Sequence, residues 1–170
     1  FPTRRSSDLN IQLSHHWGLD VVKKFEKRHQ TPFYETDLPI GALQTERFLR
    51  GLTEYIDVDQ TLLESVISEE NSRYYEYLVR TSDLIANRQF YFYSATITNT
   101  NYAIPLASFL GEELGWHVED IVVTDLLKPV AKKKYTAAFE ASGLDGKLTF
   151  DTDTQRISRT LMKSRPRNEG

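Results

Sequence analysis

Residues 89–96 read Gln-Phe-Tyr-Phe-Tyr-Ser-Ala-Thr, and this nearly continuous apolar and aromatic run decides the fold. Two shorter apolar runs follow it, Ile121-Val122-Val123 and Leu148-Thr149-Phe150. Such runs are typical of strands that are buried on both faces of a parallel sheet. Segments with helical spacing separate and follow the runs, at residues 101–114, 128–141 and 152–163. The alternation predicts an α/β fold, Rossmann-like, in which the three runs are neighbouring parallel strands with helices on both faces, in three layers.

The residues before this domain show the same alternation on a smaller scale. Their patterns predict strands at 10–14 and 33–37, and helices that begin at Gly18, after Pro39-Ile40-Gly41, and at Asp59. Pro32 ends the first helix, and Asp57 or Asp59 caps the long helix that runs to Ala86. We therefore expect a tail at residues 1–9, a neighbouring helical and sheet region with a long connecting helix at 10–87, and a Rossmann-like domain at 88–170 that is truncated at its C-terminus.

Composition excludes several classes of protein. The chain has 170 residues, of which 39% are hydrophobic and 26% charged, with a net charge of −3. This balance argues against a mainly electrostatic nucleic-acid binder, and no apolar run approaches the roughly 18–20 residues of a membrane span. The chain has no cysteine, so it contains no disulfide, no thiolate nucleophile and no Cys-ligated metal. We expect a cytoplasmic protein without nucleic-acid or membrane partners.

The first nine residues, Phe1-Pro2-Thr3-Arg4-Arg5-Ser6-Ser7-Asp8-Leu9, match one reading frame of a common sequencing adapter. We expect them to be non-native and to pack against nothing, and the sequence to be a metagenomic fragment of a longer protein.

The turn after the first apolar run is the first place to look for a ligand, because the carboxyl edge of an open α/β sheet usually binds one. The residues that we place in this turn, 94–101, offer hydroxyl and amide groups, with Asn99 and Asn101 as the weak candidates for cofactor binding. The turn lacks the glycines of a dinucleotide-binding loop. A plain capped turn is therefore the preferred interpretation.

The second candidate is Ser14-His15-His16, directly after the first strand. The two imidazoles of neighbouring strand residues point to opposite faces, so they would share a metal only in a loop. No H-x-x-x-H spacing or carboxylate triad accompanies them. A surface or capping role is preferred, and we assign no metal ligand.

Several further groups are interpreted as ordinary surface or packing. The pairs Glu112-Glu113 and Glu119-Asp120 are read as solvated acids, and Lys132-Lys133-Lys134 as a basic helix face. The tyrosines at 74, 75 and 77 are read as core packing. No catalytic residue is identified.

The order of the segments nevertheless resembles one family. Leu38-Pro39-Ile40-Gly41 followed by Thr45-Glu46-Arg47-Phe48-Leu49 is similar to a "P-I-G-x-x-x-T-[DE]-x-F-L" stretch of the nitrogenase component 1 family. That family includes molybdenum–iron protein subunits, cofactor-assembly scaffolds and chlorophyllide reductase subunits. Supporting stretches are Trp17-Gly18-Leu19 with its helix, Phe109-Leu110-Gly111-Glu112-Glu113-Leu114-Gly115, and Leu148 to Asp153.

The resemblance implies a parent protein that takes electrons from an ATP-driven iron protein through iron–sulfur or related metalloclusters, paired with a homologous subunit. It covers residues 10–166, roughly a third of a family subunit, and places no functional residue on this chain. The alpha-type subunit carries a cofactor-ligating Cys where Ser14-His15-His16 stand here, which favours a beta-like or uncharacterised homologue. Pro105 also lies where the family has no fixed proline.

Two other interpretations remain open. The parent could be a cofactor-assembly scaffold that holds a cluster without reducing a substrate, or a Rossmann-like binding module without redox activity. We expect that the fragment alone binds no cofactor and is inactive.

Overall fold

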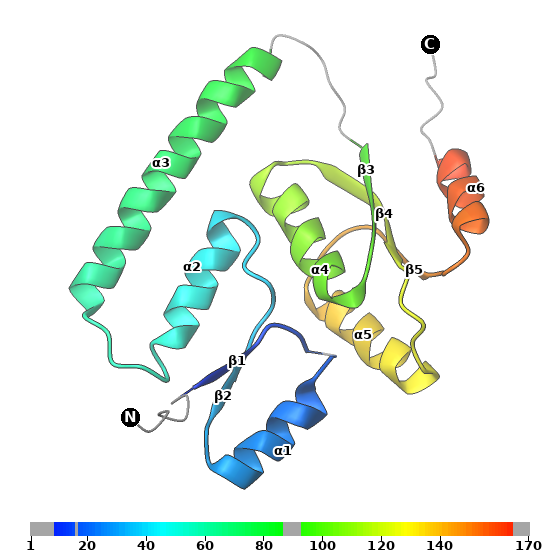
Figure 1. Ribbon diagram of the computed structural model, residues 1–170. Helices are drawn as coiled ribbons and strands as arrows, with labels where there is room; N and C mark the ends of the chain where they lie inside the picture. The colour runs from blue at the N-terminus through cyan, green and yellow to red at the C-terminus, as the bar shows by residue number, and fades with distance from the viewer. Residues whose placement is uncertain (1–8, 16, 87–92, 165–170) are drawn as a thin grey trace, which may run out of the picture. The chain divides into compact units, whose positions relative to one another are not determined.

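The computed structural model describes residues 9–15, 17–86 and 93–164 and divides the chain into two compact units, residues 1–91 and 92–170. Figure 1 shows the helices and strands of both units. The tail at 1–8 lies outside the described residues, so its non-native origin stays a prediction. Leu9 is half-buried.

The second unit contains a parallel three-stranded sheet. Its strands are β3 (Tyr93–Thr98), β4 (His117–Val123) and β5 (Lys147–Phe150), in the order β3-β4-β5. Ile97 pairs with Val122, and Val122 with Thr149, so the predicted neighbouring parallel strands are confirmed where the structure describes them. Residues 89–92 of the predicted first strand lie outside the described part.

One boundary of this sheet differs from the prediction. The predicted strand ended at Thr96, with the turn placed at residues 94–101, whereas β3 continues to Thr98 and only Asn99 separates it from α4. The alternation of Thr96, Ile97 and Thr98 explains the difference, because β-branched residues favour strands.

Helices cover both faces of this sheet. They are α4 (Thr100–Ser108), α5 (Pro129–Ala141) and α6 (Thr154–Ser164), with a π-helical turn η1 (Phe109–Glu113) after α4. One core cluster joins α4, β4 and α5: Ala103, Ala107, Val118, Ile121, Val123, Tyr135 and Phe139. Val122 alternates to the opposite face, and α6 contacts β4 and buries Ile157 (Figure 1). The predicted three-layer α/β arrangement is confirmed.

The helix predicted up to Leu114 is not uniform. After α4 the backbone hydrogen bonds join residues five apart instead of four: the Leu114 N–H donates to the Phe109 carbonyl, 3.2 Å away. Gly111 lies in this turn and lowers its preference for a regular α-helix. Gly115 then ends the segment with φ +67°, which fits its predicted place after the helix.

The first unit pairs β1 (Asn10–Gln12) with β2 (Phe33–Glu35) in parallel, and α1 (Leu19–His29) connects them. Helices α2 (Gly41–Leu52) and α3 (Gln60–Ala86) follow. The Asp59 carboxylate caps α3 by accepting from the N–H groups of Thr61 and Leu62. None of the helices that the structure describes is both long and apolar enough to span a membrane.

The interpretation of the α3 tyrosines as core packing is wrong for two of them. Tyr75 is 46% exposed and Tyr77 is 70% exposed, whereas Tyr74 is half-buried. A helix of this length turns part of its circumference to the solvent, and the neighbouring residues Tyr74 and Tyr75 point in different directions from it.

Candidate functional site

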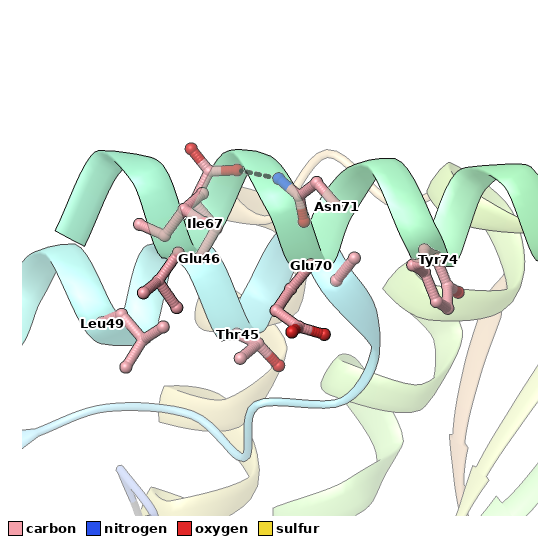
Figure 2. A pocket seen from close by; sticks show the side chains of 9 residues that line it. Thr45, Glu46, Leu49, Ile67, Glu70, Asn71 and Tyr74 are labelled. Carbon is pink, nitrogen blue, oxygen red and sulfur yellow. Dashed lines mark hydrogen bonds between the residues drawn. The ribbon is translucent and has the colours of Figure 1, made fainter. Parts of the chain in front are cut away.

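A groove of about 240 Å³ lies between α2 and α3. Figure 2 shows side chains of both helices converging on it, with Thr45 and Leu49 from α2 and Ile67 and Glu70 from α3. Ile67 is the buried hydrophobic residue among those that line the groove. The groove therefore contains part of the motif that carries the family resemblance.

Polar contacts of this motif link α2 to α3 and to its own first turn. The Thr45 hydroxyl donates to the Gly41 carbonyl at 2.6 Å. The Glu46 carboxylate accepts from Asn71 of α3 at 2.9 Å (Figure 2). It also accepts from Arg50 at 2.9 Å, and Arg50 pairs with Glu64 of α3. The hydrogen bond from Arg50 lowers the pKa of Glu46, with Asn71 acting in the same direction. These side chains hold the two helices together.

The same helix packs closely on β2. Tyr34 of β2 stacks on Phe48 of α2, with ring centroids 5.8 Å apart. The Tyr34 hydroxyl lies against Gly51, where an added Cβ would overlap it. A side chain at position 51 would therefore displace the Tyr34 ring. Phe48 of the motif thus has a structural part to play in the first unit.

His15 lies at the carboxyl ends of β1 and β2. Its Nδ1 is 2.8 Å from an oxygen of Glu35, and its Nε2 is 3.4 Å from an oxygen of Asp37. The contact with Asp37 raises the pKa of His15 to about 9, with Glu35 acting in the same direction and burial opposing both. At neutral pH the imidazole is therefore a cation between two carboxylates. The sequence pattern placed no carboxylates beside this histidine, and the structure corrects that.

The loop around His15 is closed by its own hydrogen bonds. The Ser14 hydroxyl accepts from the Trp17 N–H at 3.0 Å, and the Gln12 amide donates to the Ser14 carbonyl at 3.0 Å and to the Trp17 carbonyl. Ser14 thus holds the loop that leads from β1 towards α1. His16 lies outside the described residues.

The other two candidate residues, Asn99 and Asn101, lie at the carboxyl edge of the β3-β4-β5 sheet. The Asn99 side chain caps α4 by accepting from the Asn101 N–H at 3.0 Å. Asp125, just after β4, accepts from the Thr100 N–H and from its hydroxyl, both at 2.8 Å. A carboxylate of the chain itself therefore occupies the helix N-terminus that would otherwise attract an anion. The N–H groups of Thr100 and Asn101 at this N-terminus are therefore already donated to side chains of the chain itself.

The acids of the pairs 112–113 and 119–120 differ in their contacts and in their exposure to solvent. Glu112 accepts from the Ser108 hydroxyl at 2.6 Å, and Glu119 pairs with His117 at 2.9 Å. Asp120 is 3% exposed, so reading it as a solvated acid is wrong. Its place inside β4, between Val118 and the apolar run, turns it into the unit.

Comparison with known proteins identifies the family. The model of the nitrogenase component 1 type oxidoreductases matches residues 2–167. The chain belongs to this family. A solved structure described as nitrogenase Cp1 at pH 6.5 is similar, with a TM-score of 0.64 and 22% identity, over 92% of this chain and 32% of that chain. At this identity the likeness shows the fold alone, and the chain spans about a third of the length of that protein. No curated protein matches the sequence.

The residues that the structure describes do not fit the metalloclusters of nitrogenase component 1 proteins. The chain has no thiolate to offer, and in its described part no three His, Asp or Glu side chains are grouped to hold a metal ion. Both ring nitrogens of His15 face carboxylates, whereas a ligating imidazole must be deprotonated at one nitrogen.

Sequence reasoning missed the residues that complete both sites. Glu35, Asp37 and Asp125 are each distant in sequence from the groups they contact. The predicted strands did contain a signal. Each of these three residues ends a strand or follows one, and the carboxyl ends of parallel strands lie at the same edge of a sheet.

Proposed function

We propose that the parent protein is an electron-accepting subunit of a nitrogenase component 1 type oxidoreductase. It would receive electrons from an ATP-driven iron protein and pass them through metalloclusters to a substrate. The observation that carries the proposal is the family match over residues 2–167. The α/β fold and its likeness to a nitrogenase structure support it.

Within that parent protein, this chain would form part of the protein wall, by which we mean the polypeptide that surrounds the clusters, and it would supply no cluster ligands. The contacts at both strand edges support this role, because the candidate polar groups are occupied with one another. His15 contacts Glu35 and Asp37, and Asp125 contacts Thr100. The clusters would be held by residues of the parent outside this chain, between domains or at a homologous partner subunit, in the cytoplasm.

The test uses the full open reading frame that contains this sequence, purified without oxygen. We expect bound iron, an electron paramagnetic resonance signal, and a change in that signal only when an iron protein and MgATP are both added. Omitting ATP or replacing it with ADP is the matched control.

The other outcomes separate the alternatives. Iron that is reduced by no iron protein but is transferred to an apo-acceptor would favour a cofactor-assembly scaffold. A folded protein without iron after reconstitution would favour a Rossmann-like binding module and would contradict the proposal.

A further inference from the structure

The helices of the second unit are distributed unevenly over the two faces of its sheet. Helices α4 and α5 belong to one core cluster with Ile121 and Val123 of β4. Helix α6 contacts β4 from the other face, where Val122 is buried outside that cluster (Figure 1). The first two crossovers therefore pass over one face of the sheet, and the chain leaves β5 over the opposite face.

The face over which a crossover passes determines the direction in which the chain moves across a parallel sheet. A connection of strand, helix and parallel strand is right-handed in about 98% of cases. Crossovers of one hand on one face move in the same direction, and the order β3-β4-β5 shows this for α4 and α5. A right-handed crossover through α6, on the opposite face, moves back towards β4 and β3.

The position that this return leaves open is the outer edge of β3. Strand β4 already pairs with β3 on one side and with β5 on the other. Among the strands that the structure describes, β3 pairs with β4 alone. A further parallel strand that follows α6 in this sheet therefore lies beside β3 and makes β3 an interior strand.

The two outer strands differ in the features that protect an exposed sheet edge. Natural edge strands are often short or carry charged residues, especially lysine, because unpaired N–H and C=O groups attract other strands. Strand β5 has 4 residues and begins with Lys147. Strand β3 has 6 residues, and its sequence contains no charged residue and no proline. The sequence of β5 thus suits an edge, whereas that of β3 suits a strand with neighbours on both sides.

We propose that the outer edge of β3 binds the segment of the parent protein that directly follows α6, as a fourth parallel strand. The proposed parent is longer than this chain, which covers 32% of the similar solved structure. Main-chain hydrogen bonds would hold the added strand, as they do wherever a strand is added to a sheet edge. The inference is independent of the proposed electron transfer, since it holds equally for a reductase subunit and for a scaffold.

The backbone groups that would receive the strand follow from the register. The Thr98 carbonyl accepts from the Thr124 N–H at 2.9 Å, so the backbone groups of Thr98 face β4. Successive residues of a strand direct their N–H and C=O groups to alternate sides. Over the regular register from 95 to 98, the groups of Ala95 and Ile97 therefore point to the outer edge.

The outer edge of β5 provides a matched control in the same molecule. The Asp151 N–H donates to the Val123 carbonyl at 3.1 Å. By the same alternation, the backbone groups of Leu148 and Phe150 point away from β4.

Hydrogen exchange of the full-length parent, resolved to single amides by fragmentation in the mass spectrometer, tests the proposal. We expect the Ala95 and Ile97 amides to be protected at least about tenfold more than the Leu148 and Phe150 amides. Equal protection at the two edges, or greater protection at the β5 edge, would overturn the proposal.

A crystal structure of the same full-length protein decides which segment occupies the edge. We expect a strand from the residues that directly follow α6, parallel to β3, with β3 in the interior of the sheet. An antiparallel strand, a strand from another segment or from a second copy, or a strand that follows α6 and pairs with β5 would each overturn the proposal.

Discussion

His15 joins the ends of β1 and β2 through two carboxylates, one on each side of its ring. Because its side chain is 40% exposed, solvent screens part of the interaction, and we expect it to contribute about 1 kcal/mol or less to stability. Its value to the fold is geometric, since it fixes the loop that leads from β1 into α1.

This contact predicts a pH dependence of stability. The pKa of His15 is raised to about 9 in the folded chain, from 6.5. The stabilisation is therefore complete below pH 6.5 and is lost as the pH rises through 9. Urea unfolding of the chain and of His15→Gln should differ by about 1 kcal/mol at pH 6 and by little at pH 10. A difference that is constant across this range would mean that the ion pairs do not stabilise the fold.

At the scale of elements, the start of α4 depends on a residue 25 positions away in the chain. Asp125 accepts two hydrogen bonds from Thr100, and the Tyr135 hydroxyl donates to the Thr100 carbonyl at 3.0 Å. The start of α4 is thus held by the segment after β4 and by α5.

We predict that Asp125→Ala destabilises the second unit by roughly 1–2 kcal/mol, since it removes a capping carboxylate from a helix N-terminus. Asp125→Asn should cost less, because the amide oxygen can still accept from Thr100. Unfolding followed by the fluorescence of Trp116 measures both. If Asp125→Ala were as stable as the unaltered chain, Asn99 alone would be enough to cap α4.

The same elements show how far sequence reasoning reaches. Apolar runs predicted β4 and β5 closely, because both consist of residues that a buried parallel strand requires. The end of β3 was misplaced, since Thr96 and Thr98 are compatible with a polar turn as well as with a strand. The partners of His15 and Thr100 were not predictable from local pattern, because they come together only when parallel strands align.

At the scale of the whole molecule, the buried apolar side chains are unevenly distributed. In the described residues of the first unit Ile67 alone is a buried hydrophobic residue, whereas β4 of the second unit buries Val118, Ile121, Val122 and Val123. Buried apolar area is the main source of stability. The first unit should accordingly be the less stable of the two.

Hydrogen exchange measured by mass spectrometry checks this expectation in the intact chain. Amides of β4 should be the most protected, and amides of α3 near Ile67 should exchange at least tenfold faster. Equal protection of the two units would mean that they unfold together, contrary to their separate cores.

We propose above that this chain forms part of the protein wall around the clusters of a nitrogenase component 1 type oxidoreductase and supplies none of their ligands. The most direct measurement is the iron content and electron paramagnetic resonance spectrum of the full-length protein with and without His15→Ala. We predict the same iron per protomer and an unchanged spectrum, because both His15 nitrogens face carboxylates. Loss of iron or of the signal from a variant whose circular dichroism is unchanged would contradict the claim.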